Sequence, residues 1–383
     1  MMSTNPLKVG VMATSSKLDE RRIALHPDHL RRIPDEALAS LYLETGFASD
    51  FGMTDDGLRE VVAGVLGRDE LIERCDVIVQ PKPVLSEVSQ LRDGQVLWGW
   101  PHCVQDTAMT QVAIDKKLTL IAFEAMNHWS SDDAFQLHVF HKNNELAGYS
   151  SVLHATALAG STGTYGRRLR AAVIGFGATA RGAVTALNAI GVHDVDVLTH
   201  RDVAAVAAPI HSATIVNFGA ADTRTSVSHV ATEEGEVPLA EFLADHDIIV
   251  NCVLQDPEHP LMFIMNDDLA LVNPGTIIID VSCDEGMGFE WAKPTTFRRP
   301  TFVVGDNVLY YAVDHSPSYF WNSATWENSE ALLPFLETVM GGHEAWAADP
   351  TIRHAIEIRD GVIQNPAILA FQHRSADYPH PST

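Results

Sequence analysis

The sequence has few cysteines and few basic residues, and it lacks any long apolar run. Its four cysteines are far apart and never fall in a CxxC spacing, which indicates buried thiols of a reducing compartment rather than a disulfide or zinc framework. Lysine and arginine total 26 against 50 acidic residues, so no basic footprint for nucleic acid is expected. No stretch approaches the roughly 20 apolar residues that span a bilayer, and no signal peptide is visible. We therefore expect a cytoplasmic protein without a nucleic-acid or membrane partner.

Short apolar runs alternate with segments of helical periodicity along most of the chain. A length of 383 residues exceeds what one hydrophobic core usually fills, so we expect two domains. The strand candidates form two series: Leu7–Met12, Ser40–Glu44, Asp76–Gln80, Val96–Trp100 and Leu118–Phe123, then Ala171–Ile174, Val195–Leu198, Thr214–Val216, Ile248–Leu254, Thr276–Val281 and Thr301–Val304. This alternation predicts mainly parallel sheets with helices on both faces.

Helix candidates lie between these strands, including Asp55–Leu66 and Asp106–Lys117, each with an acidic start. Asn143–Leu158, which has no charged residue after Glu145, predicts a long helix linking the two series. Ser329–Met340 predicts a late helix that Pro334 kinks. The remaining C-terminus is too short for a third domain, so we expect it to return to the first. The predicted fold is α/β with two doubly wound domains, 1–142 with 316–383 and 143–315, joined by long helices.

Residues 170–182, RAAVIGFGATARG, place a buried strand before a glycine-rich turn and an alanine-rich helix. Gly175 allows the tight bend, Gly177 lets the backbone approach a pyrophosphate, and the small Ala180 lets helix and strand pack closely. The helix start at Ala178 and Thr179 offers backbone N–H groups to the phosphates. The turn therefore predicts dinucleotide binding by residues 143–315 and a Rossmann-like fold. The alternative is a turn whose glycines serve packing alone.

The end of the next strand distinguishes the two nicotinamide cofactors. An NAD site normally has Asp or Glu there, which accepts hydrogen bonds from the ribose 2′-hydroxyl. Here Thr199 stands in the place of the acid, and His200 and Arg201 follow. An acid would repel a 2′-phosphate, whereas an arginine can pair with it. We therefore expect NADPH rather than NADH, unless His200 and Arg201 are solvated loop residues.

Polar side chains follow several strands of the first series at their C-terminal ends, where ligands bind in open α/β sheets. Arg22 follows the opening strand, Lys82 and His102 follow the Asp76–Gln80 and Val96–Trp100 strands, and Glu124 follows Phe123. Arginine can clamp a carboxylate, lysine can polarise a carbonyl and histidine can transfer a proton. Each residue alone has an ordinary structural explanation, so the prediction of a 2-oxo acid site rests on their joint placement.

The sequence resembles the alanine dehydrogenase/transhydrogenase superfamily over nearly its whole length. The resemblance is carried by the Arg–Ile–Ala–Leu–x–Pro run at 22–27, the Lys-Pro strand end, the His102 turn and the segment 279–284, IDVSCD. Within the superfamily, the segments 99–105, 138–140, 143–148 and 313–318 are more similar to the N5-(carboxyethyl)ornithine synthases. The sequence departs from alanine dehydrogenases at 284–287, which reads DEGM instead of Asp-Gln-Gly-Gly, at 314–317, and at Thr199.

This resemblance implies an NADPH-dependent reductive condensation of pyruvate with the side-chain amine of a basic amino acid such as ornithine or lysine. It implies that Arg22, Lys82 and His102 bind pyruvate and move protons, and that Asp284 is the active-site aspartate. The alternatives are an alanine dehydrogenase, a saccharopine-type dehydrogenase that also aminates a 2-oxo acid, and a non-catalytic NADP(H)-sensing protein.

Glu124, Asp314 and His315 are candidates for binding the polar end of an amino acid substrate. Their alternative role is in ion pairs, which are common near domain junctions. No metal site is predicted. A homo-oligomer is expected because most such enzymes are symmetric assemblies.

Overall fold

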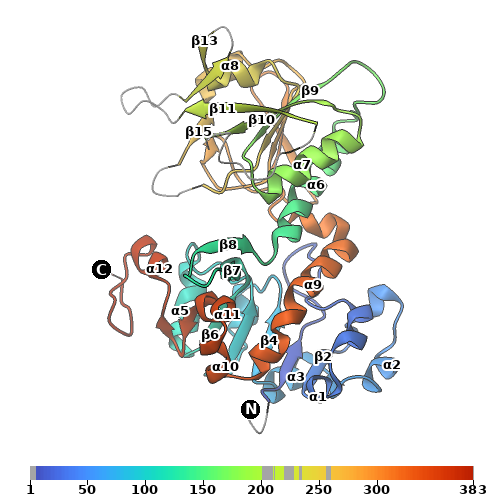
Figure 1. Cartoon of the computed structure of the whole chain (residues 1–383), viewed down its shortest axis with the longest axis vertical. Coiled ribbons are helices and arrows are strands. Elements are labelled where there is room, and N and C mark those ends of the chain that lie inside the picture. The colour runs from blue at the N-terminus through green and yellow to red at the C-terminus, as the bar shows by residue number, and fades with distance from the viewer. Residues whose placement is uncertain are drawn as a thin grey trace. The chain divides into compact units, whose positions relative to one another are not determined.

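The structure, a computed structural model, describes residues 6–200, 210, 212–219, 228–232, 235–255 and 260–382. The chain divides into two compact units, of which unit 1 comprises residues 1–141 and 321–383 and unit 2 comprises residues 142–320 (Figure 1). The sequence-based division puts these boundaries after residues 142 and 315. Both units are α/β, with mostly parallel sheets, so the predicted fold class is confirmed.

The sheet of unit 1 has the strand order β21-β20-β6-β5-β4-β1-β2-β3. Strands β1 to β6 are parallel and follow the doubly wound order 3-2-1-4-5-6, while β20 joins β6 antiparallel. The carboxyl ends of β1, β4, β5 and β6 therefore share one edge. The bounds are β1 Val9–Val11, β2 Leu41–Glu44, β3 Gly64–Leu66, β4 Val77–Gln80, β5 Val96–Gly99, β6 Thr119–Ala122, β20 Ile356–Arg359 and β21 Val362–Ile363. A separate hairpin pairs β7 Asn127–Trp129 with β8 Phe135–His138.

The predicted helix over Asp55–Leu66 is wrong in its second half. Helix α2 covers only Asp55–Arg59, and residues 64–66 form β3, which pairs parallel with β2. Two local features favour the strand. Val61, Val62 and Val65 are β-branched, and a Cβ at Gly64 would lie 3.3 Å from the Tyr42 ring on β2. The strand completes the six-stranded parallel part of the sheet.

Two apolar cores cover the faces of the unit 1 sheet. The last helix of the predicted set, α9, starts earlier than expected, at Trp321, and continues through Pro334 to Met340. Leu332, Leu336 and Val339 of α9 pack in the same core as β1 and β2. The C-terminal segment thus belongs to unit 1. The other helices are α1 Asp35–Leu38, α3 Arg68–Arg74, α4 Leu85–Val88, α5 Thr107–Asp115, α10 His343–Ala348, α11 Pro350–Ala355 and α12 Pro366–Phe371, with short 3-10 turns including η1 Pro27–Arg32, η2 Ser49–Phe51 and η3 Phe123–Ala125.

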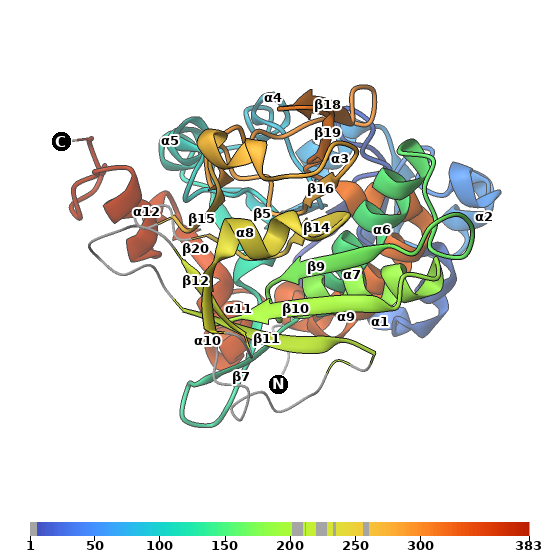
Figure 2. The same cartoon turned by 90° about the horizontal axis from the view of Figure 1, so that it is seen from above.

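The sheet of unit 2 has the strand order β13-β12-β11-β10-β9-β14-β16-β19-β18. Its central six strands are parallel and again follow the order 3-2-1-4-5-6, and Figure 2 shows β9, β10 and β11 side by side. The bounds are β9 Arg170–Ile174, β10 Asp194–Thr199, β11 Thr214–Gly219, β12 His229–Thr232, β13 Gly235–Pro238, β14 Ile248–Asn251, β16 Ile277–Asp280, β18 Thr301–Val304 and β19 Val308–Tyr311. The strand order reverses between β9 and β14, which is where such folds bind nucleotides. A small pair, β15 Met262–Ile264 and β17 Gly288–Phe289, lies outside this sheet.

Two glycines allow α6 (His141–Leu158) and α7 (Ala178–Ala189) of unit 2 to cross closely. A Cβ at Gly182 would lie 1.7 Å from the Glu145 carbonyl oxygen, and one at Gly148 would lie 2.0 Å from the Thr179 carbonyl oxygen. No side chain larger than hydrogen fits at either position. Helix α8 spans Leu239–Ala244. Among the described residues, no helix is long and apolar enough to cross a membrane.

Candidate functional site

Lys82 and His102 come together at the carboxyl edge of the unit 1 sheet. Lys82 follows β4 and His102 follows β5, and Lys82 Nζ lies 2.7 Å from His102 Nε2. A protonated lysine only donates, so Nε2 is then the acceptor and Nδ1 carries the imidazole proton. The backbone of His102 has a φ of 50°, a conformation that a non-glycine residue rarely adopts. This turn points two protonatable groups at each other at the edge where ligands bind.

Glu124 joins this pair from η3, directly after β6. Its Oε1 accepts the His102 backbone N–H at 2.7 Å and lies 3.7 Å from His102 Nδ1. The Glu124 carboxyl group therefore stabilises the positive-φ backbone conformation of His102. It also faces His102 Nδ1, the nitrogen that carries the imidazole proton. Burial and the nearby charge of Glu357 raise the pKa of Glu124 to about 8. The sequence analysis predicted that Lys82, His102 and Glu124 lie at one edge of the sheet. In the structure, His102 contacts both Lys82 and Glu124.

Arg22 is held by a carboxylate that the sequence analysis did not single out. Its Nε donates to Glu20 Oε1 at 2.9 Å and its Nη2 donates to Glu20 Oε2 at 2.6 Å, and both side chains are almost fully buried. The guanidinium also lies over the Trp100 ring, 5.4 Å from its centroid. Arg22 thus lies near the β5 end with a fixed orientation. A signal was present in the sequence, because Glu20 is two residues away.

An ion cluster supports the loop that follows β1. Arg68 donates to Glu44 and to Glu87, and also to the Thr14 carbonyl oxygen. Glu44 accepts the Ala13 N–H, and Glu87 accepts the Ser16 N–H. Burial would raise the pKa of Glu87, but its hydrogen bonds from Val84 N–H, Ser16 N–H and Arg68 outweigh burial and lower it. Because Ser15 Oγ donates to the Lys82 carbonyl oxygen at 2.5 Å, this cluster also fixes the turn that carries Lys82.

The glycine turn of unit 2 has the geometry of a dinucleotide cradle. Gly175 has a φ of +116°, and a Cβ there would lie 3.1 Å from the Cys252 carbonyl oxygen just after β14. At Gly177, in contrast, a Cβ would meet nothing within 4 Å, so this exposed backbone can be approached by a ligand. Helix α7 begins at Ala178, Thr179 is half-buried, and Ala180 is fully buried. These features fit a bound pyrophosphate.

The residues expected to select the cofactor lie at the end of β10. Thr199 is its last residue and is buried, and it pairs with Asn217 on β11. His200 is exposed, and its ring packs edge-on against Phe218 at 4.9 Å. Arg201 lies outside the described residues. The described part of this strand end therefore carries no acidic side chain.

The turn that carries Asp284 is fixed by a buried polar group. Asp280 ends β16, and its carboxylate accepts hydrogen bonds from Asn251 Nδ2 at 2.9 Å, Tyr310 Oη at 2.6 Å and Cys283 N–H at 3.2 Å. These partners come from β14, β19 and the turn itself. Burial raises the pKa of Asp280 to about 6 and also raises the pKa of the half-buried Asp284. Asp280 thus holds the 281–284 turn beside β14, at the carboxyl edge of the sheet.

Asp314 and His315 differ in accessibility. His315 is buried, and its Nδ1 lies 2.5 Å from Asp314 Oδ1. Its Nε2 is also buried and contacts no acceptor among the described residues, while its ring stands edge-on to Phe297. The side chain of Asp314 is about one-third exposed. Of the two, only Asp314 is open to a ligand in this structure.

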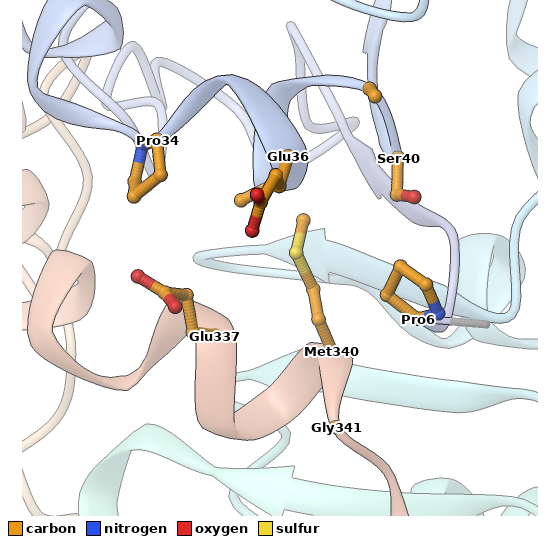
Figure 3. A pocket seen from close by; sticks show the side chains of 9 residues that line it. Pro6, Pro34, Glu36, Ser40, Glu337, Met340 and Gly341 are labelled. Carbon is orange, nitrogen blue, oxygen red and sulfur yellow. The ribbon is translucent and has the colours of Figure 1, made fainter. Parts of the chain in front are cut away.

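A pocket of about 380 Å³ lies elsewhere on unit 1 (Figure 3). Its lining includes Pro6, Ser40, Glu36, Glu337 and Met340, and Met340 points into it. Pro6 precedes β1 and Ser40 precedes β2, so the pocket lies at the amino edge of the sheet. Lys82 and His102 lie at the opposite edge. Its charged groups are carboxylates, which repel an oxo acid, so this pocket is not the candidate site.

The candidate groups belong to two units. Arg22, Lys82, His102 and Glu124 follow strands of unit 1, whereas the glycine turn, Thr199, Asp284 and Asp314 belong to unit 2. Each group lies at the carboxyl edge of its own sheet or in a segment that follows a strand. Sequence reasoning missed the residues whose side chains hold the predicted residues or their turns, which are Glu20, Arg68 and Asp280.

Comparison with known proteins places both parts of the chain in one family. Residues 10–147 match the alanine dehydrogenase/PNT N-terminal domain, and residues 150–366 match the alanine dehydrogenase/PNT C-terminal domain. An N(5)-(carboxyethyl)ornithine synthase of Clostridium botulinum is 25% identical over 324 residues, which cover 82% of this chain and 89% of that protein. An alanine dehydrogenase of Mycobacterium tuberculosis is 24% identical over 381 residues, which cover 93% and 94%.

Solved structures give the same picture of the fold. An L-alanine dehydrogenase has a TM-score of 0.73 at 18% identity and covers 95% of this chain and 99% of its own. A transhydrogenase from Sinorhizobium meliloti has a TM-score of 0.69 at 18% identity, with 94% and 99% covered. The chain therefore belongs to the alanine dehydrogenase/PNT family of nicotinamide-dependent oxidoreductases.

Proposed function

We propose that the protein joins pyruvate to the side-chain amine of a basic amino acid, such as ornithine or lysine, by NADPH-dependent reductive condensation. The observation that carries the proposal is the 2.7 Å contact between Lys82 Nζ and His102 Nε2, with Glu124 behind them. A carbonyl polariser beside a proton carrier is what reduction of a carbinolamine or imine needs. The similarity to a carboxyethylornithine synthase supports the amine.

Pyruvate binds with its carboxylate on Arg22, whose orientation Glu20 fixes. Lys82 polarises the carbonyl oxygen, and a neutral primary amine attacks the carbonyl carbon to give a carbinolamine. His102, in its protonated imidazolium form, then donates a proton to the hydroxyl oxygen, the C–O bond breaks, and the departure of water leaves a cationic C=N bond. The nicotinamide supplies a hydride when bound. Holding both substrates in attack geometry provides a large part of the acceleration.

In unit 2, the glycine turn would hold the pyrophosphate. Thr199, His200 and Arg201 would bind the 2′-phosphate. Support for NADPH comes from the end of β10, where the buried Thr199 stands in place of an acid. Asp284, on the turn held by Asp280, contacts the nicotinamide ribose and offsets developing positive charge. Asp314 binds the ammonium end of the amino acid substrate, because its carboxylate is partly exposed.

A second candidate is reductive amination of pyruvate by ammonia. It is favoured by the match to an alanine dehydrogenase over 93% of this chain, at an identity close to that of the synthase. The two reactions share the oxo acid and differ only in the amine.

The test is to follow NADPH oxidation with pyruvate plus ammonia, ornithine, lysine and other amines in turn, and to repeat the series with NADH. We expect turnover with ornithine or lysine and NADPH that exceeds turnover with ammonia. Activity with ammonia alone would contradict the condensation and favour the alanine dehydrogenase reaction. The variant His102→Ala serves as the blank for each amine.

A further inference from the structure

The backbone of His102 is held by hydrogen bonds on both of its sides. Its N–H donates to Glu124 Oε1 at 2.7 Å, and its carbonyl oxygen accepts the Asp106 N–H at 3.1 Å. His102 has a φ of 50°, and a residue in such a strained conformation persists only where its surroundings fix it. The groups that hold Cys103 and Val104, the next two residues, therefore also decide where the His102 ring lies.

A glutamine from the C-terminal segment of unit 1 holds both of these residues. Gln372 follows α12, and its Nε2 donates to the Cys103 carbonyl oxygen at 2.7 Å and to the Val104 carbonyl oxygen at 3.3 Å. Thr110 Oγ1 of α5 donates to the same Cys103 oxygen at 2.8 Å. Cys103 and Gln372 are both buried, so these bonds are made away from bulk water. One side chain that is 269 residues from Cys103 in the sequence thereby holds two peptide groups of the turn.

The orientation of the Gln372 amide is set by a buried arginine. Arg374 Nε donates to Gln372 Oε1 at 2.7 Å, and a guanidinium only donates. The amide nitrogen therefore faces the carbonyl oxygens, which only accept. Arg374 Nη1 donates in turn to Gln111 Oε1 of α5 at 2.8 Å and to the His380 carbonyl oxygen at 3.1 Å. Gln372 and Arg374 both lie beyond residue 366, where the match to the family's C-terminal domain ends.

We propose that Gln372 is a positioning residue for His102, a role that rests on the proposed function of His102 as the proton carrier. By holding the Cys103 and Val104 carbonyl groups, Gln372 keeps the His102 backbone at its positive φ and keeps His102 Nε2 at 2.7 Å from Lys82 Nζ. A displacement of about 1 Å at a reacting group can cost about a hundredfold in rate. Gln372 thus acts on the chemistry through the backbone of the turn.

Nitrogen NMR of the histidine side chains tests this role without any turnover. When the imidazole is neutral, the native His102 should show one tautomer, with a protonated Nδ1 and an unprotonated Nε2 that accepts from Lys82. Gln372→Met keeps the length of the side chain but removes both N–H donors. The two nitrogen signals of His102 should then move toward each other, because the loosened ring exchanges between tautomers. Averaged signals in the native protein, or identical signals in Gln372→Met and the native protein, overturn the proposal.

Two further variants accompany this measurement. Gln364→Met removes an exposed amide of the same segment, which donates to the Val362 carbonyl oxygen at 3.0 Å, and should leave the His102 signals unchanged. Arg374→Lys lacks the guanidinium that orients the Gln372 amide and should shift the signals in the same direction as Gln372→Met. It therefore tests the proposal even if Gln372→Met does not fold, and unchanged signals in Arg374→Lys would then overturn it.

A kinetic measurement tests the consequence for the proposed reaction. Gln372→Met should lower kcat by about ten- to a hundredfold and leave the dinucleotide Kd unchanged. A lower melting temperature with the native kcat would mean that Gln372 only fastens the C-terminal segment, and would overturn the positioning role. If the NMR result holds but no amine supports NADPH oxidation, the proposed function fails and the positioning of the His102 ring stands.

Discussion

Lys82 Nζ and His102 Nε2 lie 2.7 Å apart, although they belong to turns after two different strands. The contact exists because β4 and β5 are parallel neighbours, so their carboxyl ends meet at one edge. Glu124 follows β6, the neighbour of β5, and its Oε1 accepts the His102 backbone N–H. Three consecutive strands of the sheet thus each deliver one protonatable side chain to the same place.

Replacing His102 with alanine should abolish turnover and leave dinucleotide binding intact. General acid–base groups typically contribute about 10² to 10⁴ in rate, so kcat should fall by at least about a hundredfold. The dinucleotide Kd, measured by fluorescence titration, should not change, because the glycine turn belongs to the other unit. His128→Ala, at an exposed position on β7, is the matched control. Full activity of His102→Ala would remove this residue from the mechanism.

Two glycines of the nucleotide-binding unit should respond in opposite ways to alanine. Gly177→Ala should keep the native melting temperature but weaken dinucleotide binding, since its Cβ fills the open space above the turn. Gly182→Ala should lower the melting temperature, because its Cβ would lie 1.7 Å from the Glu145 carbonyl oxygen. Overpacking of this kind costs at least about 1–3 kcal/mol. A Gly177→Ala protein that binds the dinucleotide normally would show that the cradle is elsewhere.

An acid at the end of β10 should reverse the choice of cofactor. Thr199→Asp should weaken NADPH binding about tenfold, equivalent to about 1.4 kcal/mol, because a carboxylate repels the 2′-phosphate. NADH binding should improve, since the same carboxylate accepts hydrogen bonds from the free ribose. Thr214→Asp introduces the same charge at an exposed position at the start of β11 and should change neither affinity. Unchanged preference in Thr199→Asp would mean that this strand end does not contact the ribose.

The buried pair of Arg22 and Glu20 should show strong coupling. Breaking it with Glu20→Gln leaves a buried guanidinium without its counter-charge, which costs about 3–5 kcal/mol. Arg22→Met should be similarly destabilising. The double variant should cost less than the sum of the two, because neither charge is then left alone. The measurement is a double-mutant cycle by thermal unfolding. If the destabilisation of the double variant equalled the sum of the two single variants, the two charges would not be coupled.

Asp280 should make the stability of the native protein fall as pH rises from about 4 to about 6. Its pKa is raised to about 6 in the folded state, so the folded form binds its proton more tightly than the unfolded chain does. The stabilisation is complete below the unfolded pKa and is lost as pH passes the folded one, a difference of about 3 kcal/mol. Asp280→Asn keeps partners for Asn251, Cys283 and Tyr310 and should remove this dependence. Melting curves between pH 4 and pH 8 compare the two proteins.

Local sequence patterns predicted the groups that end strands. Lys82, His102 and Glu124 could be placed together because each follows an apolar run, and parallel strands share an edge. The side chains that hold these groups come from distant strands, and no local sequence pattern pointed to them. Asp280 meets Asn251 and Tyr310 only because β16 lies between β14 and β19 in the sheet. Short strands were also hard to recognise, since the valines around Gly64 fit a helix in isolation and become β3 only beside Tyr42 of β2.

The most direct test of the proposed chemistry is the identity of its product. The protein would be incubated with ¹³C-labelled pyruvate, NADPH, and equal concentrations of ammonia and a basic amino acid. The labelled products would then be separated and identified by mass spectrometry. The account predicts that the label appears in an N-(1-carboxyethyl) amino acid, with a new secondary amine at the side-chain nitrogen. Label found only in alanine would contradict it.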